Sequence, residues 1–373
     1  MSAPDRFRVA IVITNLSASG AEQVALNTAQ MFLRHGHQVD LILLEKVIQL
    51  PLPAALPVHC LSGQRAAWKA AGRIGVYWLA WRLKRLIKTL ETSDSPFGLV
   101  LSQLPAADRV VAASRLRRNI WYCIHTHYSA ELEGFRRHGR SIRAWRKHRQ
   151  YQACYRDKSL ITVSQGVQND LREQLGLRAH RMQTIYNPFD FEQIRSLAAQ
   201  DAPQLPDTAF ILHASAFRPV KRHDVLLEAF SQLQSRIRLV LLTEPRPELD
   251  SLIDHYGVRD SVIVAGHQRN PYPFMRKAEL TVLSSEREGL PTVLIESLVC
   301  GTPVVSTDCP SGPREILTGD LANWLAPVNE PAVLAKKIDQ ALQAAIDIDE
   351  TQLEKFGASA VYQRYSRLVR AGQ

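Results

Sequence analysis

Residues 8–44 read RVAIVITNLSASGAEQVALNTAQMFLRHGHQVDLILL, and this stretch decides the fold. The run Arg8–Thr14 has the apolar pattern of a short buried strand. Residues 15–20 are small and mostly polar, and residues 21–35 repeat apolar side chains at helical spacing. A second strand pattern follows at Val39–Leu44. A strand, a glycine-containing turn, a helix and a second strand together predict a right-handed parallel crossover unit.

The same alternation of strands and helices continues along the chain. Further strands are expected at Leu99–Ser102, Asn119–Ile124 and Leu160–Val163. A second series starts near Phe210, after a polar stretch that contains proline. We therefore expect an α/β fold with two doubly wound, Rossmann-like domains. The expected boundaries are an N-terminal domain over 1–187, a C-terminal domain over 188–355, and a final helix over 356–373 that returns toward the N-terminal domain.

The composition excludes several classes of protein. The 373 residues are 46% hydrophobic, which is enough to fill a core and excludes a wholly disordered chain. No apolar run reaches the roughly 20 residues that a transmembrane helix needs, and no export signal is read at the start. The 5 cysteines are scattered, and neither their number nor their spacing indicates disulfides or zinc. We expect a cytoplasmic protein.

Charge is distributed unevenly between the two halves. Residues 1–186 contain 27 basic and 12 acidic residues, a net charge of +15, whereas residues 187–373 contain 19 and 24, a net charge of −5. An asymmetry of this size indicates that the N-terminal half faces something anionic. Nucleic acid and an anionic membrane surface are the two candidates.

Two glutamates in the second half follow a predicted strand. Glu288 falls on the loop after that strand, Pro291 stands where a helix is expected to begin, and Glu296 falls in the second turn. Ligands of open α/β sheets bind at the carboxyl ends of the strands, and a helix start offers free N–H groups to phosphate. The alternative is an acid that favours the helix dipole and an exposed helical glutamate.

The surrounding stretch resembles the motif of two glutamates with seven residues between them in the retaining family 4 glycosyltransferases. The resemblance lies in Glu288-Gly289-Leu290-Pro291, Ile295-Glu296, residues 301–305 and residues 308–316. It implies the GT-B architecture, in which two Rossmann-like domains face each other across a cleft. It further implies that Glu288 contacts hydroxyls of a donor sugar and that Glu296 accepts hydrogen bonds from two ribose hydroxyls. Gly289, Leu290, Pro291 and Thr292 would also line the donor site.

A basic loop at residues 214–230 resembles the arginine and lysine with which this family holds the donor diphosphate. Lys221 matches the family lysine through its spacing to Phe230. The usual arginine position holds Ala216, and Arg218 stands only three residues before Lys221, so either Arg218 or Arg222 would take the second role. Fixed cations at this place stabilise the charge that develops on a departing diphosphate.

Three further resemblances are shorter. Residues 17–22 resemble the family's Gly-Gly-Ala-Glu loop with Ser19 in place of the first glycine, so Gly20 would allow close approach of a phosphate or acceptor. His125 follows a predicted strand and would touch the donor sugar, with His127 as the alternative. His267 lies in a loop that resembles the one bordering the base pocket.

No metal site or cofactor is expected. No Asp-x-Asp follows a predicted strand, and Asp347-Ile348-Asp349 falls in the expected C-terminal helical region. The resemblance implies metal-independent, retaining transfer of a hexose or N-acetylhexosamine from a nucleotide sugar, with UDP as the expected nucleotide. The acceptor would be a membrane-associated glycan or lipid-linked oligosaccharide, as in lipopolysaccharide or capsule synthesis. The alternatives are a nucleic-acid-binding protein and another GT-B enzyme, an epimerase or a phosphorylase.

A long basic helix rich in aromatic residues is expected at residues 64–91. It is either a core helix whose basic side chains reach past the apolar surface, or an interfacial helix that lies on anionic lipid. Residues 136–149 add seven more basic side chains. The interfacial alternative predicts a peripheral protein on the inner face of the cell membrane, with lipid rather than nucleic acid as the partner.

Overall fold

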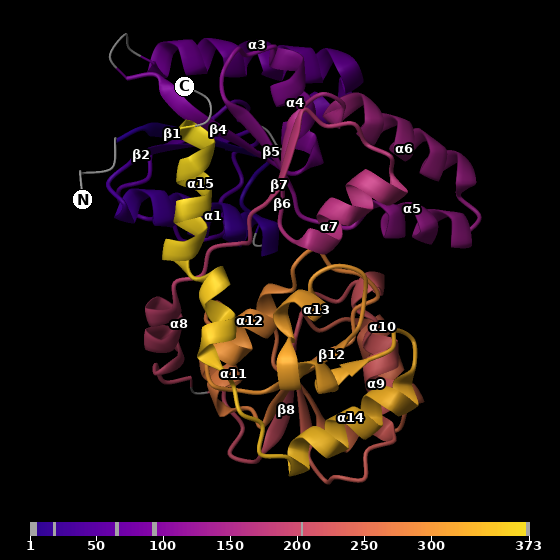
Figure 1. Ribbon diagram of the computed structural model, residues 1–373. Helices are drawn as coiled ribbons and strands as arrows, with labels where there is room; N and C mark the ends of the chain where they lie inside the picture. Colours follow the sequence, from indigo (N-terminus) through magenta and orange to yellow (C-terminus); the bar gives the residue numbers. More distant parts are fainter. Residues whose placement is uncertain (1–5, 18–19, 64–66, 92–94, 203, 371–373) are drawn as a thin grey trace. The chain divides into compact units, whose positions relative to one another are not determined.

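The computed structural model describes residues 6–17, 20–63, 67–91, 95–202 and 204–370. The chain forms two compact units (Figure 1). Unit 1 contains the described residues up to Pro188 and those from Ala358 onward, and unit 2 is Phe189–Gly357. The chain therefore leaves unit 1 once and returns to it with its last helix.

Unit 1 is built on a seven-stranded parallel sheet with the order β3-β2-β1-β4-β5-β6-β7. The strands are β1 (Arg8–Ile13), β2 (Gln38–Leu43), β3 (Val58–Cys60), β4 (Phe97–Gln103), β5 (Ile120–Ile124), β6 (Ser159–Thr162) and β7 (Arg181–Thr184). The apolar run Val9–Ile13 is completely buried at the centre of this sheet. The connections after β1 and β4 run in opposite directions, so the loops that follow these two neighbouring strands separate at the carboxyl edge of the sheet.

The helices of unit 1 cover both faces of its sheet. They are α1 (Gly20–Arg34), α2 (Ala67–Ala70), α3 (Gly72–Leu90), α4 (Pro105–Ser114), α5 (Tyr128–Arg137), α6 (Ser141–Tyr155), α7 (Gln165–Asn169) and α15 (Ala358–Arg370). Because parallel crossovers are right-handed, α1 lies on one face, and α3, α4 and α6, whose connections run the other way, lie on the opposite face. In agreement, α4 packs against both α3 and α6.

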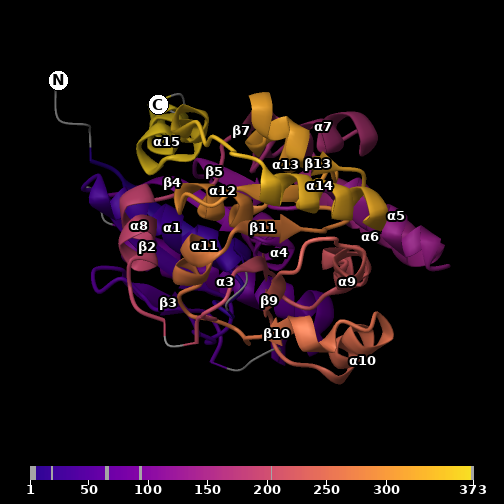
Figure 2. The same ribbon diagram turned by 90° about the horizontal axis from the view of Figure 1, so that it is seen from below.

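The last helix, α15, completes the core of unit 1. Its buried residues Val361, Tyr365 and Leu368 belong to the same hydrophobic cluster as the apolar residues of β1 and α1. The Tyr362 hydroxyl lies 2.7 Å from Nε2 of His37. In Figures 1 and 2 the helix, coloured yellow, lies beside α1.

Unit 2 repeats the design with a six-stranded parallel sheet, in the order β10-β9-β8-β11-β12-β13. The strands are β8 (Phe210–Ala214), β9 (Arg238–Leu242), β10 (Val262–Val264), β11 (Leu280–Leu283), β12 (Val304–Thr307) and β13 (Leu325–Ala326). The helices are α8 (Phe191–Ala198), α9 (His223–Ser231), α10 (Pro247–His255), α11 (Tyr272–Lys277), α12 (Thr292–Val299), α13 (Pro313–Ile316) and α14 (Pro331–Gln343). Here β8 and β11 are the neighbouring strands that diverge.

The expected long helix over 64–91 is wrong in one respect, because the described part consists of two helices. α2 ends at Ala70, Gly72 takes a positive φ of 55°, and α3 begins there. Gly75 allows α2 and α3 to pack closely, since a Cβ on it would overlap the carbonyl oxygen of Trp68. Residues 64–66 lie outside the described residues.

The Asp347–Asp349 segment was expected in a helical region, and this expectation is also wrong. Both aspartates are exposed in the loop after α14. Asp349 instead caps the 3₁₀ turn Glu350–Phe356, where its Oδ1 accepts a hydrogen bond of 2.9 Å from the backbone N–H of Thr351. Within the described residues, no helix combines the length and the apolar composition that crossing a bilayer requires.

Candidate functional site

The loops that follow β8 and β11 are held together at the carboxyl edge of the sheet in unit 2. The Ser284 hydroxyl donates to the backbone carbonyl of Lys221 over 2.8 Å. The backbone N–H of Glu286 donates to the carbonyl of Val220 over 2.9 Å. The divergence of two parallel strands is where ligands of such sheets bind, so these loops border the natural site of unit 2.

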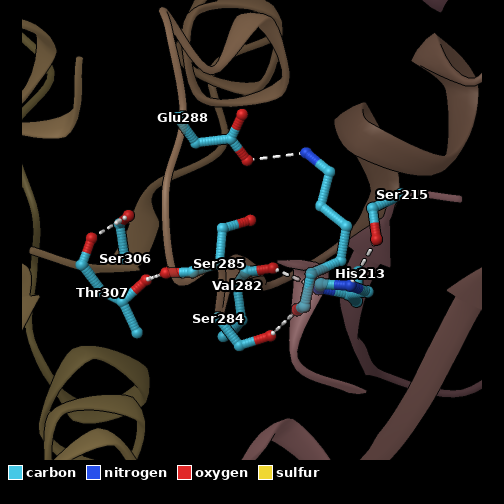
Figure 3. A network of polar contacts seen from close by, with 9 residues as sticks. His213, Ser215, Val282, Ser284, Ser285, Glu288, Ser306 and Thr307 are labelled. Carbon is cyan, nitrogen blue, oxygen red and sulfur yellow. Dashed lines mark hydrogen bonds and ion pairs between the residues drawn. The ribbon is translucent and has the colours of Figure 1, made fainter. Parts of the chain in front are cut away.

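Lys221 and Glu288, both predicted from the sequence, meet at this edge. Nζ of Lys221 donates to Oε1 of Glu288 over 2.6 Å, and both side chains are partly buried (Figure 3). The positive ammonium group and the negative carboxylate stabilise each other. An anionic ligand that binds the ammonium group therefore has to compete with the carboxylate of Glu288.

His213 links β8 to β11 beneath these loops, and sequence reasoning did not identify it. Its Nδ1 lies 2.8 Å from the carbonyl oxygen of Val282, and its Nε2 lies 2.7 Å from the Ser215 hydroxyl. Because a carbonyl only accepts, Nδ1 carries the proton and the Ser215 hydroxyl donates to Nε2. Burial lowers the pKa of His213 to about 4, so the ring is neutral and acts as a positioning group.

The two arginines that the sequence left as alternatives have different surroundings. Arg222 takes a positive φ of 49° before α9, forms an ion pair of 2.7 Å with Asp224, and donates to Oδ1 of Asn329. Arg218 is exposed at the start of the short 3₁₀ turn Pro219–Lys221. Arg222 is thus held by Asp224 and Asn329, whereas Arg218 is exposed to solvent.

The segment Gly289–Pro291 is buried between its neighbours, and Thr292 begins α12. Gly312, on the loop after β12, takes a φ of +96°, and a Cβ on it would overlap the ring of Pro291. Only glycine permits this approach of the two loops. The hydroxyls of Ser285 and Ser311 are buried and have no hydrogen-bond partner within the described residues.

Glu296 lies in the second turn of α12, close to Tyr272 and Cys300. Burial raises the pKa of the Glu296 carboxyl to about 7. The pKa of the Tyr272 phenol is raised by burial and by this carboxylate. A carboxyl pKa this close to neutral pH is common in binding sites, where a bound ligand supplies the hydrogen bonds to the carboxylate. His267 is exposed on the loop between β10 and α11, where Gly266 has a φ of +74°.

In unit 1 the contacts of the two candidate histidines show that they have different roles. His127 caps α5: its Nδ1 accepts from the N–H of Ala130 over 3.2 Å and lies 3.4 Å from the buried Asp170. His125 follows β5, and its Nε2 hydrogen bonds to Oε1 of Gln103. Burial lowers the pKa of His125 to about 4, so this ring is neutral. The structural role of His127 leaves His125 as the candidate.

Two other features lie at the carboxyl edge of the sheet in unit 1. Leu104, directly after β4, has a φ of 74°, which is strained for a residue with a side chain. Gly20 is the first residue of α1, which begins one residue before the predicted helix, while Ala18 and Ser19 lie outside the described residues. The Ser17 hydroxyl donates to Oε1 of Glu22 over 3.1 Å across the start of this helix.

Within the part of the chain that the structure describes, no group of three or more His, Cys, Asp or Glu side chains is placed to hold a metal ion.

Comparison with protein families accounts for both units. Residues 18–193 match the model described as Glycosyltransferase Family 4, and residues 198–359 match the model described as Glycosyl transferases group 1. The chain belongs to the family 4 glycosyltransferases. This confirms the family that the sequence motifs predicted, and neither model describes a nucleic-acid-binding module.

Curated relatives of this family 4 chain include two bacterial transferases. N-acetylgalactosamine-N,N'-diacetylbacillosaminyl-diphospho-undecaprenol 4-alpha-N-acetylgalactosaminyltransferase of Campylobacter jejuni is 34% identical over 172 residues, which cover 46% of this chain and 47% of the relative. Lipopolysaccharide 1,6-galactosyltransferase of Escherichia coli is 24% identical, over 60% of this chain and 64% of the relative. The chain spans about half the length of the curated relatives it matches.

Solved structures show the same fold over nearly the whole chain. HepE of Anabaena, in complex with UDP and glucose, has a TM-score of 0.74 at 18% identity and covers 98% of this chain and 100% of its own. Sucrose-phosphate synthase of Thermosynechococcus elongatus has a TM-score of 0.78 at 16% identity, with 98% and 99% covered. The family 4 chain therefore has the GT-B fold, as the sequence predicted, and its two parallel sheets contain seven and six strands.

Proposed function

We propose that this protein is a retaining glycosyltransferase that moves a hexose or N-acetylhexosamine from a UDP sugar to a glycan acceptor. The observation that carries the proposal is the contact of 2.6 Å between Lys221 and Glu288 at the diverging strands of unit 2. It joins a cation suited to a diphosphate and a carboxylate suited to sugar hydroxyls. The match of unit 2 to the group 1 glycosyl transferases supports this assignment.

Donor binding replaces the ion pair by two separate contacts. The diphosphate takes the ammonium group of Lys221, and Glu288 is released to accept hydrogen bonds from hydroxyls of the sugar. The exposed Arg218 supplies a second cation. Negative charge on the diphosphate grows as the bond to the sugar breaks, so these cations stabilise the transition state more than the bound donor.

The transfer step requires no protein nucleophile. The bond between the anomeric carbon and the diphosphate oxygen breaks, and the acceptor oxygen bonds to that carbon on the same face. The acceptor's proton passes to an oxygen of the departing phosphate. His125, neutral because burial lowers its pKa to about 4, hydrogen bonds to the donor sugar.

The nucleoside end of the donor is assigned to α12 and its neighbours. Glu296 accepts hydrogen bonds from two ribose hydroxyls, and Gly289, Leu290 and Thr292 line the same pocket. His267 borders the base, and Gly20 admits the phosphate or the acceptor. We assign no metal ion to the reaction, because Lys221 and Arg218 supply the charge that a divalent ion would otherwise provide.

The acceptor is assigned to membrane-associated glycans, with the enzyme in the cytoplasm at the inner face of the membrane. Two relatives support this choice. The C. jejuni protein is an N-acetylgalactosaminyltransferase named for a diphospho-undecaprenol compound, and the E. coli protein is a lipopolysaccharide galactosyltransferase. These acceptors carry lipid or are made on lipid, which agrees with the strongly basic N-terminal half.

A donor-hydrolysis screen tests the proposal without knowledge of the acceptor. Purified protein is incubated with UDP, GDP and ADP sugars, with and without EDTA, and the released nucleoside diphosphate is measured. We expect slow hydrolysis of one or a few UDP sugars that survives EDTA and is lost in Lys221→Ala. Early NMR spectra should show the free sugar with the anomeric configuration of the donor. Hydrolysis of none of the donors, or the inverted anomer, would contradict the proposal.

A further inference from the structure

Two helices of unit 1 carry large apolar side chains in solvent. Six of the eight exposed large hydrophobic residues in the described chain lie on α3 or α6: Ile74, Tyr77, Trp78, Trp81, Ile142 and Trp145. Ile74 is 78% exposed, Trp81 58% and Trp145 56%. Steps of three and four residues keep each set on one side of its helix. An apolar face of this kind marks a binding surface.

The tryptophan of α2 has a structural role and so contrasts with the exposed tryptophans of α3. Trp68 is only 4% exposed, and its indole N–H donates to Oε1 of Glu45 over 3.0 Å. Lys69 forms an ion pair of 2.7 Å with the same carboxylate. The buried side of α3, with Leu79, Leu83 and Ile87, already packs against the unit. Trp78 and Trp81 are thus not needed to hold α3 in place.

The charged residues of these two helices are all basic. Neither α3 nor α6 contains an aspartate or a glutamate. An arginine lies over each of the three exposed indole rings. The pairs are Arg82 over Trp78 at 5.0 Å, Arg85 over Trp81 at 5.7 Å, and Arg149 over Trp145 at 4.9 Å. Each tryptophan therefore presents its ring together with a cation, and the partner has to accept both.

The topology places both helices on one face of the sheet. The connections through α3, α4 and α6 all run in the same direction across the sheet, so the right-handed crossover rule puts them on one side. α4 lies between α3 and α6 and contacts both (Figure 1). The exposed tryptophans of both helices therefore belong to the layer that covers this one face of the sheet.

An apolar groove adjoins this face at the junction of α2 and α3. It has a volume of about 450 Å³, and its lining includes Trp68, Ile74, Gly75 and Trp78. Gly75 leaves room for the close approach of α2, which forms one wall of the groove. The groove enlarges the apolar area next to Ile74 and Trp78.

We propose that the exposed face of α3 and α6 docks on a bilayer surface of anionic lipid, with Trp78, Trp81 and Trp145 at the level of the headgroups. Tryptophan prefers this boundary because its ring is apolar and its N–H is polar. The arginines and lysines meet lipid phosphates, while Ile74 and Ile142 enter the hydrocarbon. Nucleic acid would satisfy the charges but would leave these isoleucines in water. The surface lies entirely within unit 1 and is independent of the donor assignment.

Vesicle flotation of the full-length protein tests the proposal. One set of vesicles is phosphatidylcholine, and a second contains about 30% phosphatidylglycerol. We expect at least tenfold stronger binding to the anionic vesicles, with a blue shift of tryptophan fluorescence. Binding should fall in part when salt rises from about 0.1 M to about 1 M, because charge is screened and the apolar contacts remain. Trp78→Ser with Trp81→Ser should reduce binding at least tenfold, and Trp145→Ser should reduce it less.

Matched variants separate this surface from general stickiness or charge. Ile48→Ser with Leu52→Ser removes the two exposed large hydrophobic side chains of the described chain that lie outside α3 and α6, and should leave vesicle binding unchanged. Lys84→Gln, Arg85→Gln and Lys88→Gln together should weaken binding, whereas Arg236→Gln, Arg238→Gln and Lys336→Gln in unit 2 should not. Thermal unfolding and donor hydrolysis monitor the fold of every variant.

Three outcomes would overturn the docking surface. The first is wild-type protein that does not float with anionic vesicles. The second is an equal loss of binding in the Ile48 and Leu52 control and in the tryptophan variant. The third is binding to a short nucleic-acid duplex in place of vesicles, which would reassign the basic face. The docking surface rests on the placement of the enzyme at the membrane, which the first outcome would also contradict. None of these outcomes changes the donor-hydrolysis result, so the docking surface and the donor assignment fail separately.

Discussion

Glu296 is a carboxyl group whose surroundings oppose its charge. Burial raises its pKa to about 7, so it is half protonated near neutral pH in the free protein. Two ribose hydroxyls that both donate require the carboxylate, because a protonated carboxyl has to use one oxygen as a donor. Binding of the nucleoside should therefore release a proton and depress this pKa.

The resulting pH dependence is the first prediction. The affinity for uridine, which has no phosphate to titrate, should rise about tenfold between about pH 6 and about pH 8 as the free carboxyl ionises. Calorimetry in two buffers of different ionisation enthalpy measures the affinity and the released proton. Glu296→Gln should bind uridine more weakly and without pH dependence. A variant that keeps the wild-type pH profile would show that another group is responsible.

The ion pair between Lys221 and Glu288 predicts opposite effects on binding and on turnover. Glu288→Gln frees the ammonium group, so the affinity for UDP alone should stay unchanged or increase severalfold. Donor hydrolysis should fall on the order of a hundredfold, because the contact to the sugar in the transition state is lost. Titration calorimetry and the hydrolysis assay measure the two quantities. Parallel losses in both would show that Glu288 only holds the fold of the loop.

At the scale of elements, the contact between the loops after β11 and β12 depends on Gly312. Gly312→Ala places a Cβ against the ring of Pro291 at a φ of +96°, which should destabilise the protein by about 2–4 kcal/mol and weaken UDP binding. Gly257→Ala is the control: its φ is +66°, but no atom lies within 4 Å of the added Cβ. That change should lower the free energy of unfolding by only about 1 kcal/mol. Equal effects of the two substitutions would remove the steric argument.

A buried chain of hydroxyls connects β4, α4 and α6 through Asp108. The Ser102 hydroxyl lies 2.6 Å from Oδ1 of Asp108, and the Tyr155 hydroxyl lies 2.7 Å from Oδ2. Burial raises the pKa of Asp108 from 3.8 to about 8. The native state therefore keeps a proton that the unfolded chain has lost, and the stability that depends on it falls as pH rises from about 4 to about 8.

Asp108→Asn tests this assignment by removing the titrating group. The difference in Tm between about pH 5 and about pH 8 should be smaller in the variant than in the wild type, because the amide has no proton to lose. Thermal unfolding at both pH values measures it. Parallel Tm curves for the two proteins would mean that Asp108 is ionised in the native state at both pH values.

The elements that sequence reasoning found are those with strong apolar periodicity. The strands β1, β2 and β5 were predicted within a residue or two, because each contains a continuous run of buried side chains. The strands β3, β7 and β13 were missed, since they contain two to four residues that are only partly buried or pair at an edge. The break between α2 and α3 was missed because Gly72 alone marks it.

The candidate site shows the same division between local pattern and tertiary contact. Lys221 and Glu288 were predicted from motifs, and the structure brings them together. His213 stood in a strand with no motif around it, and only the pairing of β8 with β11 gives it a role. The strained Leu104 was likewise invisible, because a positive φ at leucine is imposed by its surroundings and not by its own preference.

At the scale of the whole molecule, unit 1 depends on a helix that is remote in sequence. A chain that ends at Gly357 loses the buried side chains of Val361, Tyr365 and Leu368. At about 1.5–3 kcal/mol each, their loss is comparable to the entire stability of a small domain. Calorimetry of the truncated protein should show one unfolding transition, that of unit 2, and UDP should raise its Tm. Unit 1 should show no cooperative transition. Two intact transitions would show that α15 contributes little.

The chain enters and leaves unit 2 at neighbouring points, where the N–H of Phe189 donates to the carbonyl of Phe356 over 2.9 Å and Phe189 pairs with Gly357. This arrangement sets the order of events during synthesis on the ribosome. All seven strands of unit 1 emerge before unit 2, and α15 emerges after it. Until then the apolar surface that α15 covers stays open in the nascent chain. A ribosome stalled anywhere within unit 2 therefore carries an unfinished unit 1. The core of unit 1 can be completed only after the residues of α15 have been translated.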